Sequence, residues 1–406
     1  MGVRQGQVTV ALVLAGGGAR GAYEAGALSV LLPVLEERGE RPRIVIGTSA
    51  GALNASFLAA NAHLAASKLI PSALAIWESI RWGEVARRLI SGGSLLRASG
   101  YAGEVLGVPG ARLESLLDPE PLRATVRERV DFKQIERNVQ TGELDVAGVV
   151  ATSALTSRSV VFHRGLESPP PDRRRGIDYV ATPLLEDHVL ASSAIPAIFP
   201  AVHVEQPRIA RGWYFDGGTR LNTPIKPALE FGAERVVVIA LNSLAPGPRR
   251  LAGEERPDAL EGAGQILRGV LDDQLAADVQ TLATINGLTR ATRVVPGRKR
   301  RVPYIVIAPA EQETIGQSAL RVLRKHYRGP LPAIRSPDIT LLARLVAGSA
   351  DAEHADLLSF LMFAPEFTRA LVDLGKADAQ RWLDQSHDVD GLWQLAPIDG
   401  GARITR

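Results

Sequence analysis

The chain has 406 residues, of which 46% are hydrophobic, 22% charged and 5% aromatic, and its mean hydropathy is +0.04. This length allows two or three domains, or one large domain with additions, and it suffices to bury a core without cross-links. The chain contains no cysteine, which excludes disulfides, cysteine-ligated metals and thiol nucleophiles. The net charge of +3 is too small to indicate a nucleic-acid-binding protein.

Two apolar stretches resemble export or membrane signals. Residues 8–15 look like the core of a signal peptide, but three glycines follow directly and there is no small-residue cleavage pattern. Residues 44–67 lack charged side chains, yet polar residues such as Asn54 and Asn61 fit a membrane-spanning helix poorly. We therefore expect both stretches to be buried core elements, with no transmembrane segment and a cytoplasmic location.

The order of the predicted elements indicates an α/β fold with a mostly parallel sheet. The apolar runs predict strands at 8–15, 43–47, 145–152, 158–163, 213–215, 235–241 and 303–309. Helices are predicted at 22–38, 50–67 and 73–90, and again from about residue 311, most clearly over 354–383. The glycine- and serine-rich residues 91–112 predict a surface loop or flap, and residues 245–262 predict a long surface loop.

A G-x-S-x-G pattern, Gly47-Thr48-Ser49-Ala50-Gly51, lies between a predicted strand and a predicted helix. Such a turn strains the backbone at the serine and presents its hydroxyl beyond the end of the sheet. The glycines are needed where side chains would clash across the turn. Ser49 is therefore a candidate nucleophile, and a serine that caps the helix is the alternative.

The run Gly16-Gly17-Gly18-Ala19-Arg20-Gly21 follows the first predicted strand and opens the first predicted helix. A loop of this kind lets backbone N–H groups approach an anion closely. The run also matches the dinucleotide pattern G-x-G-x-x-G, but that site needs an acidic residue where this chain has Thr48 and Ser49. An oxyanion-binding loop beside Ser49 is the better interpretation, and a structural glycine turn is the alternative.

The third pattern, Asp216-Gly217-Gly218, follows the apolar residues 213–215. Alone it is typical of a turn. It gains weight because a serine hydrolase needs a base, and the surroundings of the seven histidines favour structural or solvated roles. His188 and His354 remain alternative bases.

The three patterns, in this order, resemble the motifs of the patatin-like phospholipase family. Residues 191–196 (ASSAIP), with Phe199-Pro200, are also similar to a segment of that family. The resemblance covers about residues 8–230, with weaker similarity at 360–379. One departure is Thr152-Ser153, where family members often have Thr-Asp.

The resemblance implies a three-layer α/β/α fold and a serine–aspartate dyad. An acylhydrolase domain would span 8–310, with its motif core at 8–230, and a helical C-terminal segment, 311–406, would pack on it or cap it. Ser49 would be the nucleophile and Asp216 the general base. The backbone N–H groups expected to hold the oxyanion are those of Gly16, Gly17, Gly18 and Ala50. The residues expected to support the motifs are Arg20, Gly21, Gly47, Gly51, Gly217 and Gly218.

Two chemical expectations accompany the dyad. The ordinary aspartate pKa near 3.9 makes a weak base at pH 7, so oxyanion stabilisation must supply much of the rate enhancement. Arg20 would position a phosphate or orient the glycine loop, and a solvated charge is the alternative. No cofactor and no metal are expected, since Asp272-Asp273 lacks the spacing of a calcium loop.

The resemblance thus predicts a lipid acyl hydrolase of phospholipase A or lysophospholipase type, with lipid or phospholipid as substrate. The alternatives are a catalytically silent or activator-dependent lipid-binding protein and a non-lipid carboxylesterase. The basic run 298–301 would suit peripheral contact with anionic head groups, although a solvated loop is the simpler interpretation. No nucleic-acid partner is expected.

Overall fold

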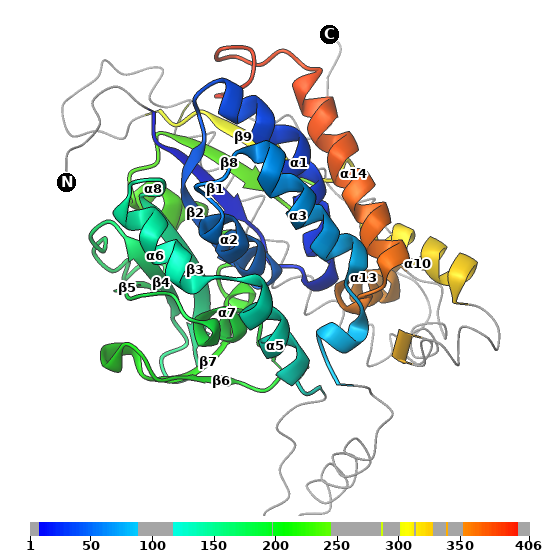
Figure 1. Ribbon diagram of the computed structural model, residues 1–406, viewed down its shortest axis with the longest axis horizontal. Coiled ribbons are helices and arrows are strands. Elements are labelled where there is room, and N and C mark those ends of the chain that lie inside the picture. The colour runs from blue at the N-terminus through cyan, green and yellow to red at the C-terminus, as the bar shows by residue number, and fades with distance from the viewer. Residues whose placement is uncertain are drawn as a thin grey trace, which may run out of the picture.

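The computed structural model describes residues 8–87, 117–196, 198–244, 286, 301–311, 314–327, 338–339 and 352–396. Its centre is a nine-stranded sheet with the main path β5-β4-β3-β2-β1-β8-β9 (Figure 1). These strands are β1 (Val10–Leu14), β2 (Pro42–Thr48), β3 (Val146–Ser153), β4 (Ser159–Gly165), β5 (Ile177–Ala181), β8 (Arg235–Ile239) and β9 (Tyr304–Ile307). Strands β3, β2, β1, β8 and β9 are parallel to one another, and β4 is antiparallel to β3. The hairpin of β6 (Val202–Val204) and β7 (Gly212–Asp216) joins the sheet through β3.

Helices cover both faces of this sheet, as expected for a three-layer α/β/α fold. The larger layer contains α1 (Gly21–Glu37), α2 (Ala50–Ala60), α3 (Ala66–Ser79), α5 (Glu120–Arg129), α6 (Phe132–Gln140), α7 (Glu186–Ser192), α10 (Thr314–His326), α13 (Ala352–Leu361) and α14 (Pro365–Leu383). The short α8 (Ile225–Glu230) packs on the other face. Alternate residues of β1 enter different cores: Leu12 and Leu14 face the larger layer, and Ala11 and Val13 face α8.

Several predicted elements differ from the observed ones. The helix predicted over 50–67 ends at Ala60, and the Arg41 guanidinium donates to the carbonyls of Ala62 and Leu64 (2.8 and 2.5 Å) just beyond it. The next helix begins at Ala66, earlier than predicted. Residues 354–383 form two helices because Pro365 begins a new one. Helices α5, α6, α7 and α8 and strands β5 and β6 were not predicted, and the loops at 91–112 and 245–262 lie outside the described residues.

The helical C-terminal segment shares the main core of the fold. Helix α14 lies along α1 in Figure 1, and a Cβ on Gly26 of α1 would lie 2.1 Å from the Val372 carbonyl oxygen. The Tyr23 hydroxyl donates to Asp378 Oδ2 (2.8 Å) across the same contact. Within the described ranges, no helix combines the length and apolar character needed to cross a membrane.

Candidate active site

The site forms where two strands meet end to end along β3. Strand β2 runs parallel to β3 and ends with Thr48 opposite Val150. Strand β7 runs antiparallel to β3 and ends with Asp216 opposite Ala151, the next residue along. The carboxyl ends of β2 and β7 therefore face each other, which brings Asp216 beside the residue after Thr48.

That residue, Ser49, has a strained backbone, with φ 53° and ψ −121°. Non-glycine residues seldom adopt a positive φ, and such strain is common at functional sites. The turn also demands close backbone approach, since a Cβ on Gly47 would lie 2.0 Å from the Gly51 carbonyl oxygen. Gly51 in turn lies against Leu14, with 2.4 Å from its ideal Cβ to the Leu14 carbonyl oxygen. The pattern thus forms the strand-to-helix turn that the sequence predicted.

Asp216 is buried, with 4% of its surface exposed, and its carboxyl group is hydrogen-bonded to the Ser49 side chain. The Gly218 N–H donates to Asp216 Oδ1 (2.7 Å). Burial raises the pKa of Asp216 to about 7, against the opposing effect of these two hydrogen bonds. Gly217 lets the turn after Asp216 pack closely on β3, because a Cβ there would lie 2.2 Å from the Val150 carbonyl oxygen.

The glycine loop enters the 3₁₀ turn η1 (Gly18–Arg20) directly after β1. Gly18 has φ +58° and leaves no room for a Cβ, which would lie 2.2 Å from the Phe360 carbonyl oxygen. The Gly16 N–H donates to Asn222 Oδ1 (3.0 Å), which contradicts the prediction that it serves an oxyanion. Gly18 and Ala50 each begin a helical turn, where backbone N–H groups have no partner within the helix.

Arg20 fixes the glycine loop to the C-terminal helix α13. Its side chain is 3% exposed, so the alternative of a solvated charge is wrong. Its Nε donates to Ser359 Oγ (2.7 Å), and its guanidinium carbon lies 3.9 Å from the centre of the Phe360 ring. One terminal nitrogen donates to the Asp356 carbonyl oxygen (3.1 Å), and the other to Asn242 Oδ1 (2.9 Å). Arg20 therefore orients the loop and does not line the pocket described next.

A largely apolar pocket opens beside Ser49 and Gly18. Its walls come from α2, α3, α5, α13 and the segment after α7, and they include Leu53, Phe57, Ile76, Trp77, Ile80, Val85, Leu122, Val126, Ile195, Phe199, Phe360, Leu361 and Phe363. The polar Asn54 is fixed in this wall: it donates to Glu24 Oε2 (2.7 Å) and accepts from Trp77 Nε1 (2.8 Å). Gly21 leaves space for the same indole, which its ideal Cβ would approach to 2.7 Å.

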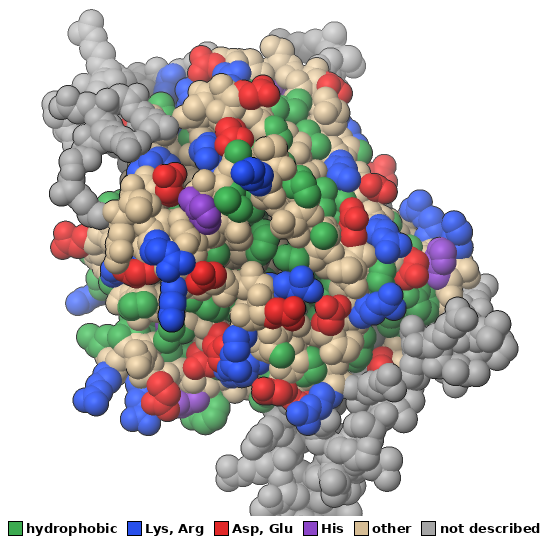
Figure 2. Space-filling view, viewed as in Figure 1, with side chains coloured by type: hydrophobic (Ala, Val, Ile, Leu, Met, Phe, Trp, Pro, Cys, Tyr) green, Lys and Arg blue, Asp and Glu red, His purple; other side chains and the backbone are tan. Residues whose placement is uncertain are grey.

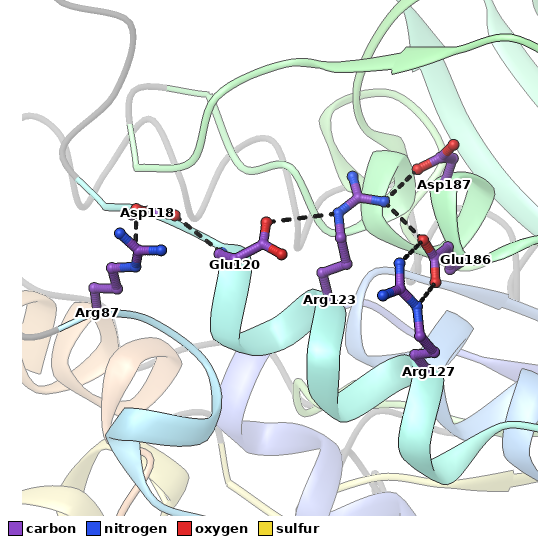
Figure 3. Close-up of polar contacts among 7 residues, drawn as sticks. All are labelled: Arg87, Asp118, Glu120, Arg123, Arg127, Glu186 and Asp187. Carbon is purple, nitrogen blue, oxygen red and sulfur yellow. Dashed lines mark hydrogen bonds and ion pairs between the residues drawn. The ribbon is translucent and has the colours of Figure 1, made fainter.

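Helix α5, one wall of this pocket, is tied to α7 by ion pairs (Figure 3). Arg123 contacts Glu186 (3.0 Å) and Asp187 (2.6 Å), and Arg127 makes a two-pronged contact with Glu186 (2.8 and 2.7 Å). Only Leu122 and Val126 of this helix are buried. Surface charge pairs therefore supply much of the contact between α5 and its neighbour.

Of the two histidines left as alternative bases, the structure describes the side chain of His188 only. Both ring nitrogens of buried His188 are engaged: Nδ1 accepts from the Leu185 N–H (3.0 Å) and Nε2 contacts the Gln206 carbonyl oxygen (2.8 Å). The side chain of His354 lies outside the described residues. Across the described part of the chain, no three histidine, aspartate or glutamate side chains form a group suited to a metal ion.

Two polar residues of the site were not singled out from the sequence. Ser192 Oγ accepts from the Ser49 N–H (2.8 Å) and donates to the Val150 carbonyl oxygen (2.5 Å), which fixes the strained turn to β3. Asn222 holds the glycine loop through Gly16. Ser192 belongs to the segment 191–196 that carried part of the resemblance, whereas Asn222 has no sequence signal beyond its place four residues after Gly218.

Comparisons with known proteins identify the family of this chain. The model of the patatin-like phospholipase family matches residues 12–229, more than half of the chain, and the protein belongs to this family. Similar solved structures include VipD from Legionella pneumophila, at 13% identity and TM-score 0.30, covering 92% of this chain and 88% of VipD. Another is human GIVD cytosolic phospholipase A2 in complex with methyl gamma-linolenyl fluorophosphonate, at 12% identity and TM-score 0.39. That match covers 92% of this chain and 57% of the human protein. Comparison with curated protein sequences gave no match.

Proposed function

We propose that the protein is a serine acyl hydrolase that cleaves carboxylic esters of phospholipids or lysophospholipids. The observation that carries this proposal is that Asp216 is hydrogen-bonded to Ser49, which lines an apolar pocket. Ser49 Oγ attacks the ester carbonyl while Asp216 accepts its proton, and the protonated Asp216 then gives that proton to the departing alcohol. Water, deprotonated by the same carboxylate, attacks the acyl-enzyme and releases the fatty acid and free Ser49.

The raised pKa of Asp216 supports its role as the base. An aspartate at its ordinary pKa is almost fully ionised at pH 7 but has little affinity for a proton. Burial brings the pKa of Asp216 to about 7, near the value at which a general base is most effective. The weakness of a carboxylate base, expected from the sequence, is thereby reduced.

We assign the rest of the transition-state stabilisation to backbone N–H groups that donate to the oxyanion. The N–H groups of Gly17, Gly18 and Ala50 are the proposed oxyanion donors, since that of Gly16 is taken by Asn222. Loss of one such donor typically costs about 3 kcal/mol of transition-state stabilisation. The apolar pocket would hold an acyl chain, which favours a lipid over a small polar ester.

The test compares wild type with Ser49→Ala and Asp216→Asn on a soluble short-chain ester and on phospholipid micelles. Both variants should fold, with a melting temperature no lower than that of wild type, and lose activity by about 1,000-fold or more. Ser79→Ala, at an exposed serine of α3, is the matched control and should be fully active. Inert wild-type protein on both substrates would overturn the proposal in favour of a silent protein, and an active Asp216→Asn variant would exclude the dyad.

A further inference from the structure

The end of the sheet that carries the site also exposes unusually placed apolar side chains. Leu155, Ile209 and Trp213 are 92%, 91% and 57% exposed. Leu155 lies in the turn between β3 and β4, Ile209 lies between β6 and β7, and Trp213 belongs to β7. Isolated exposed apolar residues need no explanation, but a contiguous group requires one.

These residues are neighbours because of how the strands pair. The Ala154 N–H donates to the Trp213 carbonyl oxygen (2.9 Å), so the turn at 154–157 adjoins β7. Ile209 sits at the tip of the hairpin whose strands pair His203 with Trp213, and this hairpin lies at the lower left of Figure 1. In the space-filling view, hydrophobic and basic side chains lie over that corner, with some acidic ones between them (Figure 2).

Arginines lie in the same segments as the apolar residues and in an adjoining turn. We call residues 153–158, 172–176, 205–213 and 220 the arginine-rich edge; it contains seven arginines and two acidic residues. The turn at 172–176 joins this edge because the Ser159 N–H donates to the Gly176 carbonyl oxygen (2.9 Å), and Arg173 and Arg174 are exposed there. Arg158 pairs with Asp178 (2.7 Å) and Arg211 with Glu205 (3.0 Å), and Asp172 accepts from the backbone N–H groups of Arg174 and Arg175 (3.0 Å each). The edge remains positively charged after these pairs are counted.

We propose that the arginine-rich edge docks the protein on an anionic lipid surface. Exposed Leu, Ile and Trp side chains would enter the interfacial region, where tryptophan is favoured, and the arginines would contact lipid phosphates. The edge is close to the catalytic pair, since Ser153 lies only three residues along β3 from Val150, about 10 Å. Docking here would bring the catalytic pair close to the membrane that holds its substrate, a consequence that rests on the proposed function.

The test measures binding apart from hydrolysis. The full chain with Ser49→Ala is sedimented with phosphatidylcholine vesicles, with and without phosphatidylglycerol. Leu155→Asp with Ile209→Asp should lower vesicle binding about tenfold or more on both lipids, because both side chains lose apolar contact. Arg173→Ser with Arg174→Ser should lower binding about tenfold on anionic vesicles and little on neutral ones.

Leu166→Asp is the matched control. Leu166 is 44% exposed but follows β4 at Gly165, which pairs with Val146 at the opposite end of the sheet. This variant should bind vesicles as the parent does. Vesicles should also shift the tryptophan emission to shorter wavelength, and Trp213→Phe should abolish most of that shift.

Wild-type binding by the Leu155→Asp and Ile209→Asp double variant, or an equal loss in Leu166→Asp, would overturn the proposal. So would self-association in the absence of lipid that the double variant abolishes, because the edge would then join two copies of the chain. Hydrolysis of a soluble short-chain ester should be unchanged by the edge substitutions in the otherwise wild-type chain. If wild type binds vesicles but hydrolyses no ester, docking stands and the proposed function fails.

Discussion

The two turns that meet at the site are held in different ways. The serine turn is confined chiefly by backbone atoms, since Gly47 packs on the Gly51 carbonyl and Gly51 on that of Leu14, and the Ser192 hydroxyl adds a hydrogen bond. The glycine loop also packs on a backbone carbonyl, that of Phe360, but its position depends chiefly on the Arg20 side chain, whose partners Asp356 and Ser359 lie more than 300 residues later. The serine turn is therefore determined by nearby sequence and a rigid sheet, whereas the shape of the glycine loop depends on the docking of α13.

Gly47→Ala tests the backbone-held turn and should have the largest effect. The alanine Cβ would lie 2.0 Å from a backbone oxygen, so the strand-to-helix turn must shift. This shift should lower the free energy of unfolding by about 3 kcal/mol or more. Thermal unfolding should show a large loss of stability, with activity at background. Gly83→Ala, which meets nothing within 4 Å, is the matched control and should behave as wild type. Near-normal stability in Gly47→Ala would mean that the turn is less rigid than the comparison requires.

The pH dependence of activity tests whether the ionisation of one group beside the serine turn, the Asp216 carboxyl, governs the rate. Arg20 keeps its charge throughout, so activity should follow Asp216, whose pKa is about 7. Between about pH 8 and about pH 5 the rate of ester hydrolysis should fall about 100-fold as this carboxylate becomes protonated. A profile with its midpoint near pH 4 would indicate a carboxylate base of ordinary pKa and would contradict the raised pKa of Asp216.

Stability should change in the opposite direction over the same range. Because the folded-state pKa of Asp216 lies above its unfolded value of 3.8, the folded protein retains a proton that the unfolded chain releases. The stabilising contribution is therefore complete below about pH 4 and is lost as pH rises through about 7. Denaturant titrations at several pH values should show that the free energy of unfolding of wild type falls as pH rises through about 7. The Asp216→Asn variant should lack this fall.

The same contrast explains what could be predicted from the sequence. The serine turn, the Asp-Gly-Gly turn and the mostly parallel sheet each have a local pattern, and the structure contains all three. The contacts of Arg20 with α13 have no local pattern, so its role stayed open between phosphate binding, loop orientation and solvation. Helix α5 was missed because only Leu122 and Val126 of its ten residues are buried, which leaves a weak apolar repeat. The raised pKa of Asp216 depends on burial that no spacing in the sequence reveals.

Arg20→Lys tests the side-chain-held loop. Lysine keeps the positive charge but lacks the planar guanidinium that bonds to Ser359 and stacks on Phe360. The loss of these contacts should cost about 2 kcal/mol. We expect kcat to fall about tenfold with KM nearly unchanged, because Arg20 positions the oxyanion loop and does not line the pocket. Ser359→Ala removes only one of its hydrogen bonds and should give a smaller loss. The pH midpoint should stay near 7 in both variants, and a shifted midpoint would place Arg20 in contact with the dyad.

The smallest effect is expected where surface charges hold a wall of the pocket. Arg123→Gln removes the contacts of Arg123 with Glu186 and Asp187, which are partly exposed and worth less than about 1 kcal/mol together, and leaves Arg127 paired with Glu186. KM for a long-chain ester should change by no more than about threefold, and high salt should reproduce the change in wild type because it screens the same pairs. Arg137→Gln, which breaks an exposed pair with Asp131 on α6, is the control and should leave KM unchanged. If Arg123→Gln instead abolishes activity on long and short esters alike, α5 is as rigid a support as the sheet, and the contrast between backbone-held and side-chain-held parts of the site does not extend to this wall.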